Sequence, residues 1–154
     1  MKKVAIIMGS ESDRAVVNFS LEYFEFFNVP VEILVMSAHR TPELVQDFAK
    51  NARKNGFGII VACAGMAAHL PGVAAAYTTL PVIGVPLASG ELNGLDSLYS
   101  IVQMPAGVPV ATMGIGKAGV RNAAVLAAEI LALSDEKIAA KLDEFKKRGC
   151  KVTP

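Results

Sequence analysis

The sequence predicts an α/β protein built on a parallel sheet that helices cover on both faces. Short apolar runs alternate with longer stretches in which apolar residues recur every three or four positions, the patterns of buried strands and of amphipathic helices. Regular alternation of the two is typical of a parallel sheet between two helical layers. The chain has 154 residues, 53% of them apolar, and no repeat or low-complexity linker, which is enough for one domain with a full core.

Apolar runs and boundary residues place the elements in order. The expected strands are 4–8, 31–36, 57–63, 80–85 and 108–113. The expected helices run from Ser12 or Asp13 to 27, then 42–54, 67–77, 96–103, 117–133 and about 134–149. Thr41-Pro42 has the order of an N-cap followed by proline at the first helical position. The residues expected to face the core are Val16, Phe19, Tyr23, Phe26 and Phe27 in the first helix and Leu44, Val45, Phe48 and Ala52 in the second.

These elements predict a three-layer, Rossmann-like or flavodoxin-like single domain over residues 1–154, with an additional C-terminal helix. Ser134 is expected to open that helix, and Ile138, Leu142 and Phe145 form a narrow apolar stripe along it. The stripe suits packing on the body of the domain or on a neighbouring subunit, and the sequence leaves both open.

Charged residues are distributed unevenly. None occurs from 55 to 90, and only Glu91 and Asp96 occur between there and Gly116. Glycines and prolines interrupt this region before it reaches the ~20 apolar residues of a membrane-spanning helix, so we expect no membrane association. A small monomer has difficulty hiding so much apolar surface. The excess of apolar residues favours burial of apolar surface between subunits. An unusually apolar core in a monomer is the alternative.

The remaining composition narrows the class of protein. The net charge is +1, without a Lys/Arg-rich run, which argues against nucleic-acid binding. Cys63 and Cys150 form neither a disulfide framework nor a metal-binding spacing, and Cys63 is expected to be a buried, inert thiol. Met1-Lys2-Lys3 leads directly into a strand rather than into the apolar core of a signal peptide, so we expect a cytoplasmic protein.

A polar cluster follows the first strand. Gly9 allows a tight turn, and the start of the next helix favours an anion, to which Ser10 and Ser12 could donate hydroxyl hydrogen bonds. Asp13 would repel a phosphate, which favours ribose hydroxyls as its partner. An ordinary helix cap that binds no ligand is the alternative.

A second cluster, Ser37 to Pro42, follows the second strand. The guanidinium of Arg40 can bind two phosphate oxygens at once. Histidine can carry or release a proton near neutral pH, so His39 is the natural general acid/base. Because the carboxyl ends of parallel strands form one edge of a sheet, where ligands bind, we expect both clusters at a single site. The alternative for this pair is a surface Arg beside a helix-flanking His.

The third cluster, Ala64 to Gly72, consists mostly of small residues. Such residues let the backbone approach a ligand closely and could enclose a dry pocket. His69 is then an oriented hydrogen-bond donor in that pocket or, alternatively, a partly buried histidine with an ordinary partner.

Several long motifs, in order along nearly the whole chain, resemble the N5-carboxyaminoimidazole ribonucleotide mutase family, the class I AIR carboxylases of purine biosynthesis. These motifs are Met8 to Asp13, Ser37 to Pro42, Ala64 to Gly72, Pro81 to Pro86 and Asp96 to Pro109. The sequence departs from the family pattern at Met66, where a second glycine is frequent, and at Glu11, where aspartate is common.

The resemblance implies a flavodoxin-like fold, a homo-octamer, and neither metal nor organic cofactor. It implies that Ser10, Asp13 and Arg40 bind the nucleotide with Ser37 nearby, and that His39 transfers the proton. It also implies a pocket around the carboxylate, with Ser12 close by, shaped by a loop that includes Ala64, Gly65, His69 and Leu70.

The implied reaction is an isomerisation that moves a carboxylate from the exocyclic N5 nitrogen to ring carbon C4. Our hypothesis is that the substrate loses carbon dioxide in a closed pocket, that C4 attacks the trapped carbon dioxide, and that His39 removes the C4 proton. The imidazole ring itself carries the electrons, so no cofactor is expected. The rivals are a carboxylase that uses free carbon dioxide and a binding or signalling module on the same fold.

Overall fold

The computed structural model describes residues 2–153 and contains a five-stranded sheet in the order β2-β1-β3-β4-β5. All neighbouring strands are parallel. The strands are β1 (Lys3–Met8), β2 (Val31–Val35), β3 (Phe57–Gly65), β4 (Val82–Leu87) and β5 (Ala111–Thr112). The expected boundaries at Met1 and Pro154 lie outside the described residues.

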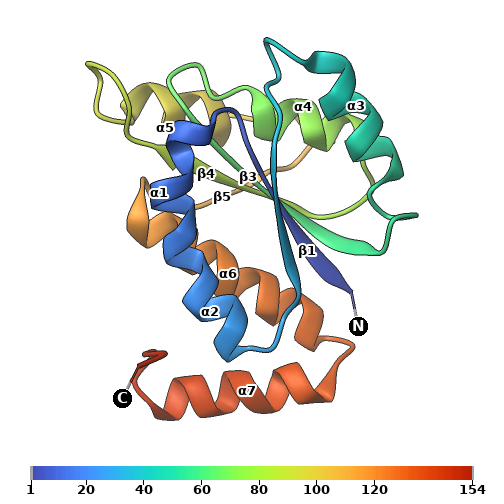
Figure 1. Ribbon diagram of the computed structural model, residues 1–154, viewed down its shortest axis with the longest axis vertical. Coiled ribbons are helices and arrows are strands. Elements are labelled where there is room, and N and C mark those ends of the chain that lie inside the picture. The colour runs from blue at the N-terminus through green and yellow to red at the C-terminus, as the bar shows by residue number, and fades with distance from the viewer. Residues whose placement is uncertain (1, 154) are drawn as a thin grey trace.

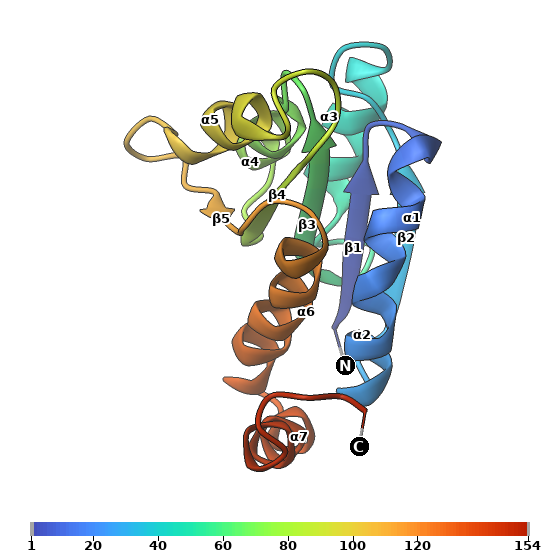
Figure 2. The same ribbon diagram turned by 90° about the vertical axis from the view of Figure 1, so that its left-hand side faces the viewer.

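Helices cover both faces of this sheet, which confirms the predicted three-layer class. They are α1 (Arg14–Val17), α2 (Leu21–Phe26), α3 (Pro42–Asn51), α4 (Leu70–Tyr77), α5 (Leu95–Val102), α6 (Lys117–Ala132) and α7 (Glu136–Lys147). Helices α3, α4 and α5 lie on one face, and α1, α2 and α6 lie on the other, with α7 beneath them (Figures 1 and 2).

Two apolar cores result, because successive side chains of a strand point to opposite faces. On β1, Val4, Ile6 and Met8 join the core that α2, α6 and α7 complete. Ala5 and Ile7 join the core that α3, α4 and α5 complete. Both faces of the central strands are therefore buried, as their continuous apolar runs predict.

The first predicted helix is interrupted by short 3₁₀ segments, η1 (Glu11–Asp13) and η2 (Asn18–Ser20). The Ser20 hydroxyl donates to the Val17 carbonyl at 2.7 Å, a local bond of the kind that competes with regular helical hydrogen bonding. The buried side chains of this stretch are Val17, Ser20, Phe24 and Phe27. The expectation that Phe19 faces the core is therefore wrong, since Phe19 is 38% exposed.

The predicted core face of helix α3 is wrong at one position. Val45 and Ala49 are buried, as is Ala52 at the C-terminal cap, and Phe48 packs against the core, whereas Leu44 is 50% exposed. Spacings of four and three residues place the three buried residues on one side of the helix, and Leu44 lies one position away from that side.

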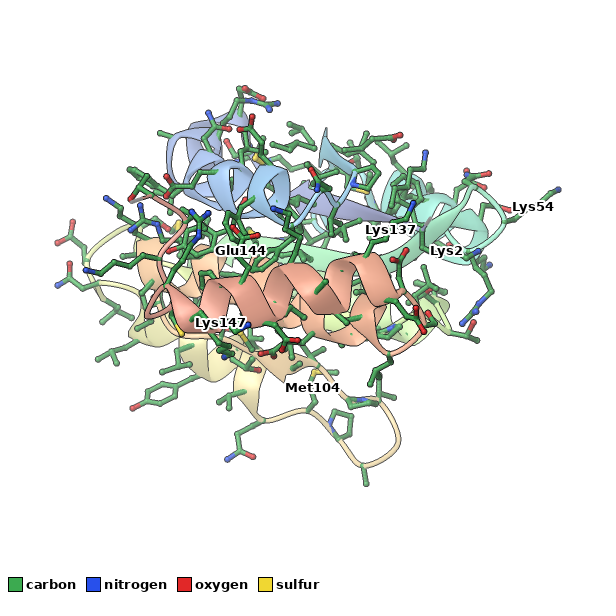
Figure 3. The ribbon with its side chains drawn as sticks, turned by 90° about the horizontal axis from the view of Figure 1, so that it is seen from below. Lys2, Lys54, Met104, Lys137, Glu144 and Lys147 are labelled. Carbon is green, nitrogen blue, oxygen red and sulfur yellow. The ribbon has the colours of Figure 1, made fainter. Side chains whose placement is uncertain are left out.

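The C-terminal helix packs on the body of the same chain. Phe145 of α7 contacts the rings of Tyr23, Phe26 and Phe27 with centroids 5.2–6.0 Å apart. The cap of α7 is Asp135 rather than Ser134, because the Asp135 carboxylate accepts from the backbone N–H groups at positions 137 and 138. Figure 3 shows α7 from below, with Lys137, Glu144 and Lys147 along it and Lys2 near its start. No helix within residues 2–153 has the length and apolar character needed to cross a membrane.

Candidate active site

The loops that follow β1, β2, β3 and β4 meet at the carboxyl edge of the sheet, around a pocket of about 420 Å³. The strand order makes these loops neighbours, since β1 lies between β2 and β3 and the chain crosses from one side of β1 to the other. Such a switch point is where open α/β sheets bind ligands. The lining residues are Gly9, Ser10, Ser12, Asp13, Ser37, Ala38, His39, Arg40, Ala64, Gly65, Met66, Ala67, Leu70 and Ser89.

All predicted site residues line this pocket except His69, which contacts it through His39. The three sequence clusters therefore converge on one place. The pocket lining includes the predicted functional groups, which are the hydroxyls of Ser10, Ser12 and Ser37, the carboxylate of Asp13, the guanidinium of Arg40 and the imidazole of His39.

The loop after β1 is organised by Ser10. Its Oγ accepts hydrogen bonds from the Ser12 backbone N–H at 3.3 Å and from the Ser12 hydroxyl at 2.8 Å, so Ser10 caps the 3₁₀ turn. The Ser10 hydroxyl proton remains available to a ligand. Burial raises the pKa of Asp13 above its usual value, and a backbone hydrogen bond with Ser10 offsets part of that effect.

Ser37 organises the loop after β2. Its Oγ accepts from the backbone N–H groups of His39 at 3.3 Å and Arg40 at 3.2 Å. The Thr41 hydroxyl bonds both backbone groups of Ser37, at 2.9 and 3.2 Å, instead of capping α3 with its side chain as an N-cap residue commonly does. Arg40 forms no salt bridge with any carboxylate within residues 2–153, which leaves its guanidinium free for an anion.

His39 and His69 form a contact between the second and third loops. His39 Nε2 lies 2.8 Å from His69 Nδ1, with ring centroids 4.9 Å apart and ring planes at 83°. One nitrogen donates and the other accepts. His69 immediately precedes α4, so the contact connects the ends of β2 and β3.

Cys63, near the carboxyl end of β3, is buried, as predicted. Burial, and secondarily the charge of nearby Asp13, raises the pKa of its thiol. The thiolate needed for nucleophilic chemistry is therefore disfavoured. Within the described part of the chain, no three His, Cys, Asp or Glu side chains are arranged to hold a metal ion.

The sequence did not single out Ser89 or identify Met66 as a lining residue. β4 ends at Leu87 rather than at the expected Val85. Ser89, the first polar side chain after that strand, was therefore not predicted to line the pocket. A hydroxyl two residues beyond the true end of the strand was the available signal. Met66 has a left-handed backbone with φ of 53°, a conformation that glycine adopts more readily.

The parallel sheet and the pocket at its carboxyl edge define the flavodoxin-like α/β class. Residues 3–151 match the family described as AIR carboxylase, and the chain belongs to that family. This confirms the resemblance found in the motifs.

Similar proteins bear a more specific name. The Escherichia coli K12 protein named N5-carboxyaminoimidazole ribonucleotide mutase is 55% identical over 145 residues, covering 94% of this chain and 86% of that protein. The Bacillus subtilis protein of the same name is 58% identical over 141 residues, covering 92% and 87%.

Solved structures agree with the fold. The crystal structure of Treponema denticola PurE superposes with a TM-score of 0.87 at 28% identity, covering 97% of this chain and 92% of that one. A 3-dehydroquinate dehydratase-like protein from Bifidobacterium longum has a TM-score of 0.53 at 18% identity, covering 86% and 99%, and shares the fold alone.

Proposed function

We propose that the protein is an isomerase that interconverts N5-carboxyaminoimidazole ribonucleotide and 4-carboxy-5-aminoimidazole ribonucleotide in purine biosynthesis. The observation that carries the proposal is the 55–58% identity, over more than nine-tenths of the chain, to proteins that bear the mutase name. The pocket supplies a proton-transfer group and a phosphate-binding group suited to that substrate.

The nucleotide is held by the loops after β1 and β2. Arg40 binds the phosphate, because its guanidinium pairs with no carboxylate among residues 2–153 and can bond two oxygens. Ser10 and Ser37 offer hydroxyls to the nucleotide, and Asp13 accepts from the ribose. These contacts lie away from the reacting atoms and orient the ring. Ser12 lies close to the carboxylate.

His39 moves the proton. When the bond between N5 and the carboxylate carbon breaks, carbon dioxide leaves, the bonding electrons stay on N5, and His39 gives N5 a proton. The electron-rich ring then attacks carbon dioxide through C4, which forms the new carbon–carbon bond and regenerates a carboxylate. His39 takes the proton that C4 loses, so the residue ends in its starting state.

The third loop confines the carbon dioxide. Ala64, Gly65 and Leu70 present an apolar wall, and expulsion of water from the pocket prevents loss of the intermediate. His69 supports this arrangement by fixing the position of the His39 ring.

The assembly we propose is a homo-octamer of single-domain subunits of residues 1–154, acting in the cytoplasm without metal or organic cofactor. Self-association is supported by apolar side chains exposed along α5. Leu95 is 50% exposed, Tyr99 68% and Val102 46%, and Leu92 in the preceding loop is 59% exposed. A second copy would bury this surface, which is unusual on a monomer. We propose neither a nucleic acid nor a membrane as a partner.

The deciding experiment follows the carboxylate. The chelator-treated protein is incubated with unlabelled N5-carboxyaminoimidazole ribonucleotide in medium that contains ¹³C-bicarbonate, and the product is examined by mass spectrometry. A mutase yields mainly unlabelled product and a metal-independent rate. Stoichiometric incorporation of label identifies the carboxylase suggested by the family's description, and the absence of any product favours a binding module.

A further inference from the structure

We propose that Ser89 is a substrate-binding residue whose hydroxyl donates a hydrogen bond to the migrating carboxylate, and that Gly65 lacks a side chain in order to leave room for that hydroxyl. The inference rests on the proposed function and assigns a residue within the same pocket.

Ser89 and Gly65 are in close contact across two loops. A Cβ at position 65 would lie 2.0 Å from the Ser89 Oγ and 3.2 Å from the Ser89 Cβ. Both separations are too short for an ordinary contact. Only glycine at position 65 therefore allows the serine hydroxyl to stand where it does.

The Ser89 hydroxyl is free to bind a ligand. Ser89 is half-buried and lines the pocket, yet its hydroxyl forms no hydrogen bond to any other residue within 2–153. Buried polar groups usually find a partner, so a half-buried hydroxyl facing a cavity is well placed to donate to a ligand.

Its position selects the carboxylate rather than the phosphate. Arg40 follows β2 and Ser89 follows β4, three strand spacings or about 14 Å apart along the sheet edge, a span comparable with the length of a ribonucleotide. The neighbouring strand along that edge is β3, and its end and the following loop line the pocket with apolar side chains at Ala64, Met66 and Ala67. In this part of the pocket, Ser89 supplies the hydroxyl donor that a carboxylate needs.

The first test is Ser89→Ala, which removes one oxygen and adds no volume. We expect kcat for N5-carboxyaminoimidazole ribonucleotide to fall about 10- to 100-fold, the loss typical of a hydrogen bond to a charged group, with KM changed less than about threefold. We also expect more free aminoimidazole ribonucleotide per turnover, because carbon dioxide is held less firmly. The matched control is Ser134→Ala, which removes a hydroxyl at the start of the turn into α7 and should leave both quantities unchanged.

The second test displaces the hydroxyl without removing it. In Gly65→Ala the new methyl group forces the Ser89 hydroxyl to rotate out of its position, because a Cβ there would lie 2.0 Å from the Ser89 Oγ. We expect kcat to fall about as far as in Ser89→Ala, and the double variant to be no slower than either single variant.

The outcomes distinguish the inference from the function on which it rests. If the unmodified protein converts the substrate and Ser89→Ala matches it in kcat and in retention of the intermediate, Ser89 does not bind the carboxylate. If Gly65→Ala matches the unmodified protein in kcat, the steric pairing is wrong. If the unmodified protein itself fails to convert the substrate, the proposed function fails, and the role of Ser89 fails with it.

Discussion

His39 Nε2 and His69 Nδ1 lie 2.8 Å apart, so two loops separated by 30 positions in the chain are joined by their imidazoles. A neutral imidazole has one donor and one acceptor nitrogen, and a protonated imidazole has two donors. The hydrogen bond therefore persists when both imidazoles are neutral or when one of them is protonated. It is lost when both are protonated. This matches the proposed role, in which His39 alternately gives and takes a single proton.

His39→Asn should lower kcat by about 10²–10⁴-fold, the usual contribution of a general acid/base. The side chain of Asn has polar groups but cannot transfer a proton near neutral pH, so binding of the nucleotide should change little. Steady-state kinetics and calorimetric titration with product measure the two effects. His69→Gln is the comparison variant and should lose only about tenfold, because the reacting imidazole remains. An equal loss in both variants would contradict the assignment of proton transfer to His39.

Arg40→Ala should raise KM about 10- to 100-fold, because charge-assisted hydrogen bonds to the phosphate disappear. Arg40→Lys keeps the charge without the two-pronged geometry and should recover part of the affinity. Arg53→Ala removes a guanidinium that bonds Thr79, outside the pocket, and serves as the control. Unchanged KM in Arg40→Ala would place the phosphate elsewhere.

Asp13→Asn should stabilise the fold at neutral pH while reducing kcat/KM about tenfold or more through loss of an acceptor for the ribose. Because burial raises the pKa of Asp13 in the native state, its ionised form opposes folding at high pH. The gain in stability of Asp13→Asn over the parent protein is complete above the raised pKa of Asp13. This gain declines as the pH falls through that pKa and vanishes below the unfolded-state pKa of about 3.9. Urea unfolding of both proteins between pH 3 and pH 8 measures the difference, and a variant less stable than the parent at pH 7 would contradict it.

Gly119→Ala should destabilise the protein by about 1–3 kcal/mol. A Cβ at position 119 would lie 1.8 Å from the Gly114 carbonyl oxygen, a backbone atom that cannot rotate away. Gly114→Ala is the control, since open space surrounds its would-be Cβ, and its stability should change by less than about 1 kcal/mol. Equal unfolding midpoints for the two variants would show that the start of α6 adjusts freely.

Tyr99→Asp should dissociate the proposed assembly, because it places a charge at the centre of the apolar surface of α5. Light scattering after size exclusion should show smaller species for this variant, with lower activity. Lys137→Asp, on exposed α7, alters charge away from that surface and should leave the mass unchanged. If the unmodified protein is monomeric, the proposed interface at α5 is wrong.

Much of the fold was accessible to prediction because the strands alternate with helices and each boundary has a local cause. The incorrect predictions also have local causes. β5 spans Ala111–Thr112 instead of 108–113, and Pro109, which lacks a backbone N–H, suits a loop or a sheet edge better than a paired strand. Phe19 and Leu44 were assigned to the core because periodicity defines a stripe only to within about one position. Packing against the sheet selects the face that is buried.

The site could be outlined but not completed. Ser10, Asp13, His39 and Arg40 stood out because polar residues that directly follow apolar runs are visible in a sequence. Ser89 did not, since its significance depends on where β4 ends and on the absence of a side chain at position 65.

The order of residues by itself determined the class of fold, the chemical groups available to the site and the family. The tertiary structure alone decided which of those groups touch, because contacts such as His39 with His69 and Ser89 with Gly65 join segments that the chain separates by more than twenty residues. Such contacts depend on strand order and on the rotation of side chains toward a shared edge, and a linear pattern contains neither.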